Sequence, residues 1–152
     1  MAESRYIVFR LHDEAYSIDL MFVKEIEENY TVIPIPNCPP HIKGIINLRG
    51  EVVPVYSLRS RFGLEENTAT CKLILTYIHG YVIGFEVDSI QGIEDVSQED
   101  RLPTPKLICS EDTTYIDCII HASSGIAVNI SVENILSENE VRTLAEHLSE
   151  DE

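Results

Sequence analysis

The sequence predicts a mainly-β protein with one helix at its carboxyl end. Short runs of β-branched and aromatic residues recur along the chain with turn residues between them, the pattern of roughly nine strands. A polar stretch at 65–68 separates two sets of these runs, and helical spacing of apolar residues is clear only after residue 137. Such strands are compatible with one sandwich or with two small barrels joined near residue 65.

The first hairpin is expected near the amino terminus. Residues 6–11 predict one strand and residues 16–19 predict its partner, with a polar turn between them. The next segment, 20–28, is ambiguous, because apolar residues such as Val23 and Ile26 fit a short helical turn about as well as a strand. We favour a turn followed by a strand.

A second hairpin is expected in residues 41–58, after a loop that prolines keep irregular. Each proline lacks an N–H and restricts the residue before it; the four are Pro34, Pro36, Pro39 and Pro40. Two apolar runs then flank Arg49-Gly50-Glu51, where Gly50 suits the positive φ of a tight turn. Residues 58–63 predict one helical turn that ends at Gly63.

The second half of the chain repeats the β pattern. Four more strands are expected, at 71–78, 81–88, 115–121 and 125–130. His79-Gly80 predicts the turn between the first two of them. Residues 97–114 are polar, include two prolines and predict a long surface loop.

The carboxyl end predicts a helix at 137–150. Ser137 and Glu140 have the spacing of a capping box, in which each side chain bonds the other residue's backbone N–H. The apolar residues that follow recur at helical spacing; they are Val141, Leu144, Ala145 and Leu148. We expect this face to pack against the body of the protein.

The charge of the chain excludes several classes of function. The 26 acidic and 11 basic residues give a net charge of −15, which disfavours binding to nucleic acid or anionic lipid. The imbalance is uneven, because residues 1–63 carry seven basic against eight acidic groups, whereas 64–152 carry four against 18. No apolar run approaches the roughly 18 residues of a membrane helix, and the start lacks a signal-peptide pattern. We expect a cytosolic protein without direct membrane contact.

Motifs for catalysis, metals and cofactors are not found in the sequence. The four cysteines, Cys38, Cys71, Cys109 and Cys118, form no C-x-x-C pair and are expected to be unpaired thiols. The phosphate-binding, dinucleotide-binding, serine-hydrolase and metalloprotease patterns are missing as well. We therefore expect no enzyme, no metal and no cofactor. The alternative is a catalytic group that folding assembles from Cys118, His121 and Asp117.

An interaction module remains, and long stretches of the chain carry a recognisable pattern. The most specific is Ile42-Lys43-Gly44-Ile45-Ile46-Asn47-Leu48-Arg49-Gly50. The others are Tyr6-Ile7-Val8-Phe9-Arg10-Leu11, Ile18-Asp19, Val23-x-Glu25-Ile26, Val53-Pro54-Val55, Leu58-Arg59-x-x-Phe62-Gly63, Val82-Ile83-Gly84-x-x-Val87-Asp88-x-Ile90 and Tyr115-Ile116. These stretches resemble the CheW family of chemotaxis coupling proteins over nearly the whole chain, to about Leu136.

The resemblance implies a fold and a function. The fold is a single CheW-like domain of two SH3-like five-stranded β-barrels with a shared core, expected at about 6–64 and 70–136, followed by the helix at 137–150. The function is that of a non-catalytic adaptor without a cofactor. Its implied partners are the regulatory domain of a CheA-type histidine kinase and the cytoplasmic tip of chemoreceptors. Such an adaptor is expected to be a monomer when free and to be recruited to membrane-associated receptor arrays. The alternative is a CheW-like scaffold in a non-chemotaxis array that controls pili or development.

The resemblance also implies binding residues. Lys43, Gly44 and Arg49 are expected at the receptor-facing region together with Val23, Glu25 and Ile26, and Ile90 and Ile93 are expected on the other barrel. We predict an apolar groove between the barrels with Glu25, Lys43 and Arg49 at its rim.

The sequence departs from the family pattern at four positions. Family members usually carry Gly at Ser17 and Cys118, and Asp at Ser57 and Asn129. Because a Gly is often needed for positive φ or close backbone approach, we expect local remodelling of the C-terminal barrel.

Overall fold

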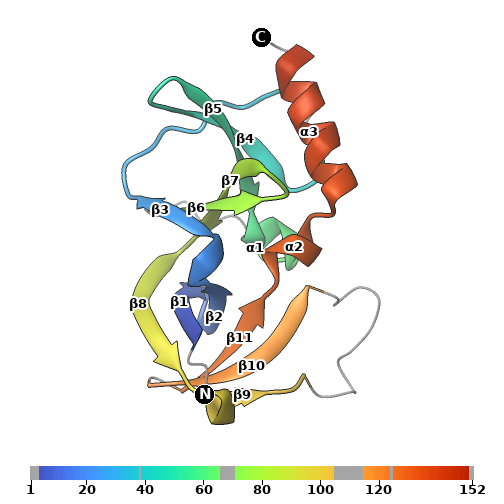
Figure 1. Ribbon diagram of the computed structural model, residues 1–152. Helices are drawn as coiled ribbons and strands as arrows, with labels where there is room; N and C mark the ends of the chain where they lie inside the picture. The colour runs from blue at the N-terminus through green and yellow to red at the C-terminus, as the bar shows by residue number, and fades with distance from the viewer. Residues whose placement is uncertain (1–3, 38, 66–70, 105–114, 124, 151–152) are drawn as a thin grey trace.

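The computed structural model describes residues 4–37, 39–65, 71–104, 115–123 and 125–150, and it contains two β-sheets (Figure 1). In the last helix the side chains of residues 138, 145 and 147–150 lie outside the description. No helix of the described chain has the length and apolar character needed to cross a membrane. The mainly-β prediction is confirmed.

The first sheet, called sheet A here, is built from both ends of the chain. Its spatial order is β8-β1-β2-β11-β10-β9, and neighbours are antiparallel except for the parallel pair β2–β11. The strands are β1 (Ser4–Leu11), β2 (Glu14–Asp19), β8 (Ser89–Val96), β9 (Arg101–Leu102), β10 (Ile116–Ala122) and β11 (Gly125–Ile130).

The second sheet, sheet B, comes from the middle of the chain. Its order is β3-β6-β7-β5-β4, antiparallel except for β5–β7. The strands are β3 (Val23–Glu27), β4 (Ile42–Leu48), β5 (Glu51–Ser57), β6 (Lys72–Ile78) and β7 (Tyr81–Val87). Five strands match the predicted barrel, whereas sheet A adds the two-residue β9 to five longer strands.

In the described part of the chain, five short or terminal helices connect and cover the sheets. They are η1 (Leu20–Phe22), α1 (Leu58–Arg61), η2 (Gln98–Asp100), α2 (Val132–Ile135) and α3 (Glu138–Glu150). The capping box of α3 is confirmed, since the Ser137 hydroxyl accepts from the Glu140 N–H at 3.1 Å and the Glu140 carboxylate from the Ser137 N–H at 3.3 Å. Val141 and Leu144 are buried as expected, while the predicted contacts of Ala145 and Leu148 lie outside the described side chains.

The core has three parts that follow the strand alternation. Ile7 and Phe9 of β1 point into a large cluster shared with sheet B and α3, whereas Tyr6 and Val8 point into a cluster of sheet A alone. In β6, Ile74 likewise belongs to the shared cluster, and its neighbours belong to a cluster of sheet B. Each sheet thus has an interior of its own and a face toward the other, as the SH3-like expectation requires.

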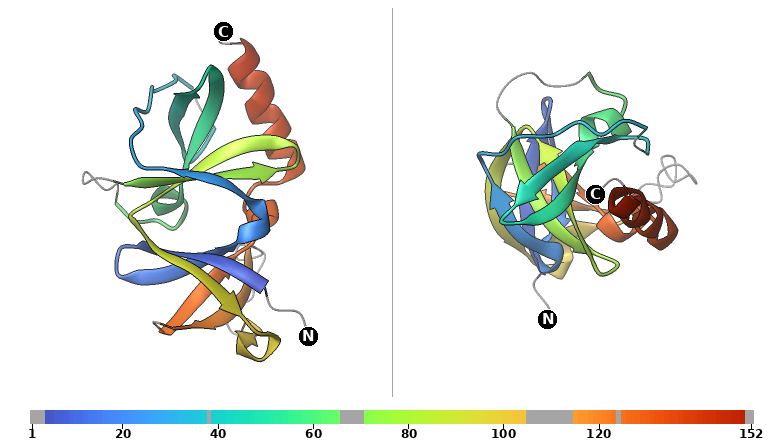
Figure 2. Two further views of the ribbon diagram at one scale, coloured as in Figure 1. Left: turned by 60° about the vertical axis from the view of Figure 1, so that its left-hand side comes forward. Right: turned by 90° about the horizontal axis from the view of Figure 1, so that it is seen from above.

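The predicted barrel boundaries are wrong. Residues 6–64 and 70–136 do not form separate units, because β1 and β2 pair with β8 and β11, and the predicted boundary lies in the sequence between β5 and β6, which both belong to sheet B. The chain crosses from sheet A to sheet B through η1 and returns at Asp88 between β7 and β8, as the left view of Figure 2 shows. The charge boundary therefore reflects surface composition and not the division between the sheets.

Most local predictions are confirmed, and one strand is new. The tight turns have left-handed backbone at both central residues, with φ of 50° and 90° at Arg49 and Gly50 and similar values at His79 and Gly80. The strand β8 was not predicted, although it pairs with β1 from Ser4 to Arg10. Cys118 is a free thiol, as expected, whereas Cys38, Cys109 and most of the 97–114 loop lie outside the described residues.

The departures from the family pattern introduce no left-handed backbone at Ser17 or Cys118, since neither residue has positive φ. The register of β10 against β11 does shift between Ile116 and Cys118, so the ladder is irregular next to Cys118. The buried Ser17 hydroxyl donates to Asn129 Oδ1 at 2.8 Å across the β2–β11 pair. Ser57 caps α1 by accepting from the Ser60 N–H at 3.2 Å, a bond that an Asp could also make.

Candidate functional site

The edge strand β3 of sheet B and the edge strand β8 of sheet A lie beside each other where the two sheets meet. This junction between β3 and β8 is called the seam here. Sheet B ends at β3 and sheet A ends at β8, so both strands have one unpaired edge. A surface hollow of about 620 Å³ links them; it is lined by Ile26, Glu27, Glu28, Asn29, Lys72, Ser89 and Ile90. The structure thus brings residues of both predicted sides of the groove together.

A β-bulge in β3 turns Val23 and Ile26 to the same face. Residues three apart on a regular strand point to opposite faces. Here the register shifts between Val23 and Glu25, so that Val23 is opposite Thr76 while Ile26 is opposite Ile74. Thr76 and Ile74 are two apart and share a face, and Ile74 belongs to the core between the sheets. Val23 and Ile26 therefore both face the seam.

The strand β8 repeats this arrangement from the other sheet. Ile90 is opposite Phe9 and Ile93 is opposite Ile7, with a register shift between them. Phe9 and Ile7 both belong to the shared core. The second bulge thus places Ile90 and Ile93 on the seam face as well.

The four apolar residues form a partly exposed surface. Val23 and Ile90 are half-buried and pack against the shared core. Ile26 and Ile93 remain 37% and 59% exposed, although both face the seam. An exposed apolar face of this kind can take apolar side chains from a partner.

Charges lie on the opposite face of β3. Arg49, at the tip of the β4–β5 turn, donates to Glu25 at 2.5 Å, and Glu27 is 3.6 Å from the same guanidinium. The hydrogen bond from Arg49 lowers the pKa of Glu25 below its usual value. The predicted rim charges Glu25 and Arg49 therefore form one cluster at an exposed corner.

Lys43 and Gly44 do not line the hollow beside β3 and β8. Lys43 donates to the buried carboxylate of Glu86 at 2.7 Å, and the Tyr30 hydroxyl donates to the other oxygen of Glu86 at 2.7 Å. Lys43 lines a different hollow of about 840 Å³, which does not include β8. At Gly44 a Cβ would stand 2.2 Å from the Ile33 carbonyl oxygen, so the glycine permits the backbone pairing of Ile33 with Ile45.

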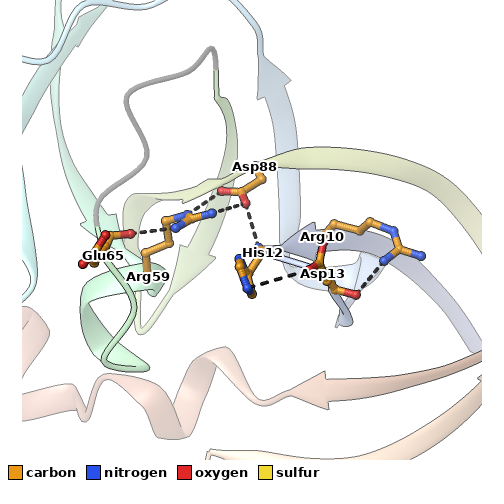
Figure 3. A network of polar contacts seen from close by, with 6 residues as sticks. All are labelled: Arg10, His12, Asp13, Arg59, Glu65 and Asp88. Atoms are coloured by element: carbon orange, nitrogen blue, oxygen red, sulfur yellow. Dashed lines mark hydrogen bonds and ion pairs between the residues drawn. The ribbon is translucent and has the colours of Figure 1, made fainter.

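Sequence reasoning missed the network that holds the two sheets together. Arg59 binds Asp88 through two hydrogen bonds of 2.8 and 2.6 Å, and Asp88 also accepts from the His12 N–H at 2.7 Å (Figure 3). Arg59 donates in addition to the Glu65 carbonyl at 2.6 Å. Arg59 and Asp88 both stand in the quoted motifs, which could have marked them as a pair. They join α1, the β1–β2 turn and the crossing into β8.

The suggested catalytic group is not assembled. Cys118 lies on the buried face of β10, whereas Asp117 and His121 alternate onto the exposed face. Burial raises the pKa of Cys118, which disfavours the thiolate that a nucleophile needs. Within the described ranges, no group of three His, Cys, Asp or Glu side chains could hold a metal ion.

Known proteins with similar sequences point to one family. The family model described as CheW-like domain matches residues 5–140. The chemotaxis protein CheW of Treponema pallidum (strain Nichols) is 34% identical over 147 residues, covering 91% of this chain and 85% of that protein. Protein FrzA of Myxococcus xanthus is 29% identical over 106 residues, covering 68% of this chain and 66% of that protein.

A solved structure agrees with the sequence comparison. The crystal structure of scaffolding protein TtCheW from Thermoanaerobacter tengcongensis matches with a TM-score of 0.77 and 28% identity, covering 85% of this chain and 89% of that chain. All eight predicted binding residues fall within the matched range 5–140. By sequence, by fold and by the position of its motifs, the chain belongs to the CheW family.

Proposed function

We propose that this protein is a non-catalytic adaptor that couples chemoreceptors to a CheA-type histidine kinase. Family membership supports the role, and one structural observation carries its mechanism. Two edge strands, one from each sheet, present Val23, Ile26, Ile90 and Ile93 on the same seam. The adaptor needs no cofactor for this role, and as a free protein it is a monomer in the cytoplasm.

The seam is the receptor site in this proposal. A helix from the cytoplasmic tip of a chemoreceptor lays its apolar face against the four residues, in the manner of helix-in-groove recognition. The Glu25–Arg49 cluster lies beside it and fixes orientation. Binding of the receptor and of the kinase's regulatory domain recruits the adaptor to membrane-associated arrays.

A charge placed on the seam tests the receptor site. Ile93→Asp should abolish binding of a receptor-tip fragment, because desolvating an unpaired carboxylate there costs several kcal/mol. Since Ile93 is 59% exposed in the free protein, the unfolding midpoint should hardly change. Calorimetry and thermal unfolding measure the two quantities. Val23→Asp is the companion variant from the other sheet.

The control variant is Glu146→Lys on the exposed side of α3, which should leave receptor affinity unchanged. Unchanged affinity in Ile93→Asp would refute the seam as the receptor site. Loss of both affinity and stability in Val23→Asp would show only that this half-buried residue belongs to the core.

Thiol reactivity separates the adaptor from an enzyme. Burial raises the pKa values of both Cys71 and Cys118, so less thiolate is present at neutral pH than for an ordinary cysteine. Alkylation by iodoacetamide should therefore be slow at pH 7. Its rate should rise only at a higher pH than the rate for an ordinary exposed cysteine. A cysteine that reacts fast at pH 6 would favour catalysis.

The second candidate function is a scaffold in an array with an output other than chemotaxis, such as pili or development; one relative, protein FrzA, is not named as a chemotaxis protein. A pull-down from the native cytosol decides between them. Recovery of a histidine kinase together with a chemoreceptor supports the first function. Recovery of a kinase and a long helical receptor from another pathway supports the second.

A further inference from the structure

We infer a second docking site around Arg61, which takes a protein segment in which an apolar side chain stands next to a carboxylate. This site shares no lining residue with the hollow beside β3 and β8. It goes beyond the coupling role proposed above and does not depend on it.

A ladder of aromatic rings forms one wall of the site. The rings stack from the buried Phe9 through Tyr16 and Phe62 to Tyr115, and successive ring centroids are 6.1, 5.3 and 5.5 Å apart. The last three rings line a surface hollow of about 410 Å³; its other walls are Arg61, Ile116, Val128 and Ile130. Aromatic and aliphatic walls of this kind favour an apolar occupant.

Arg61 stands between this hollow and a second one. Its guanidinium carbon lies 4.7 Å from the centroid of the Tyr115 ring, a cation–π contact. Arg61 also lines a hollow of about 570 Å³ between α3 and β4, whose walls include Ile42 and Leu144 but also the carboxylate of Glu140. A partner's carboxylate would therefore reach the guanidinium from the side of the aromatic hollow, where the walls are apolar.

No carboxylate of the described residues pairs with Arg61, although Glu140 lines the larger hollow beside it. Among the described residues, no carboxylate lies within 4.0 Å of the Arg61 guanidinium, whereas Arg49 and Arg59 each pair with a carboxylate. This holds although the chain has 26 acidic residues. The planar guanidinium suits a two-point hydrogen bond to a carboxylate, and such a bond is stronger beside apolar walls than in open water.

The surrounding charge selects a singly charged group. With a net charge of −15, the protein repels ligands that carry several negative charges, such as nucleic acid. One carboxylate next to one apolar side chain satisfies both the arginine and the hollow. A protein segment with this pair of side chains is therefore the occupant.

Two short peptides test the site on the full chain. The probes are acetyl-Glu-Leu-Phe-amide, which carries one carboxylate, and the same peptide with Gln in place of Glu. In ¹⁵N-labelled protein, the Glu peptide should shift the amide signals of Phe62, Ile116 and Val128 and should bind about tenfold tighter than the Gln peptide. Arg61→Gln should remove this difference. Arg142→Gln, at an arginine that donates only to Asn139 among the described residues, should retain it.

Equal affinity of the two peptides for the unchanged protein would overturn the proposal, as would shifts centred on Ile26 and Ile90. Concentration-dependent shifts of the same amides without peptide would assign the hollow to a second copy of the chain and would also overturn it. If Arg61→Gln does not fold, 0.5 M NaCl takes its place. Salt should then weaken the binding of the Glu peptide and leave the binding of the Gln peptide unchanged. Equal weakening of both affinities would contradict the site.

Discussion

Two arginines of the first half of the chain, Arg59 and Arg49, both face carboxylates, yet their surroundings differ. The side chains of Arg59 and Asp88 are each 16% exposed, and their two-point bond joins segments from both sheets. Arg49 is 63% exposed and pairs with Glu25 at the tip of a turn. Both arginines stand in motifs of the same family pattern. Arg59 nevertheless links the two sheets, whereas Arg49 is a surface residue. Burial and connectivity, more than motif membership, separate the two roles.

The largest expected effect is on stability, from Arg59→Met. This change leaves Asp88 without its cation in a mostly buried position, which costs about 3 kcal/mol of unfolding free energy. Urea unfolding measures it. Arg59→Lys should lower the free energy of unfolding by only part of this amount, because lysine keeps the positive charge but cannot form the two parallel hydrogen bonds of a guanidinium. A stable Arg59→Met variant with weakened partner binding would place Arg59 on the surface and remove the contrast with Arg49.

A smaller effect is expected for a polar pair that is buried but lies within one sheet. Ser17→Ala leaves the Asn129 oxygen without its 2.8 Å donor and should cost about 1 to 2 kcal/mol. Replacing both partners, as in Ser17→Ala with Asn129→Val, should recover part of the loss in the same urea assay. A loss as large as that of Arg59→Met would mean that burial alone, and not the link between sheets, sets the cost.

The smallest change in stability is expected for Arg49→Ala. The ion pair between Arg49 and Glu25 is exposed and screened by solvent, so its loss costs little. Alanine and arginine both carry a Cβ, so the substitution does not change the strain of the left-handed backbone at position 49. Assembly of a kinase–receptor complex should nevertheless weaken, which co-sedimentation with receptor and kinase measures. A collapse of the melting temperature would show that Arg49 is structural, like Arg59.

Local features of the fold were predictable because short-range chemistry sets them. The Gly50 and Gly80 turns and the capping box of α3 each depend on residues within a few positions of one another. The strand β8 was missed because Ser89–Val96 contains a glycine and adjacent acidic residues, and little apolar alternation. Its partner β1 lies more than seventy residues earlier, which no local pattern reveals.

The candidate site was only partly predictable for the same reason. The family pattern indicated Val23, Ile26, Ile90 and Ile93, but their spacing of three would put each pair on opposite faces of a regular strand. Only the two bulges, which depend on cross-strand pairing, bring them to one seam. Lys43 lies outside the hollow beside β3 and β8, because it reaches Glu86 on β7, two strands away in sheet B. Its role in binding stays a prediction.

The origin of sheet A at both ends of the chain has a consequence for biosynthesis. On the ribosome, β1 and β2 emerge first, but β1 pairs with β8 and β2 with β11, which are made only after all of sheet B. An isolated two-stranded hairpin is only marginally stable in water. The β1–β2 hairpin therefore stays unfolded, or packs against sheet B, until β8 and β11 have been synthesised. A nascent chain halted after residue 87 would therefore hold a complete set of sheet B strands and an unfinished partner. Release of the carboxyl end should be the step that commits the protein to its final fold.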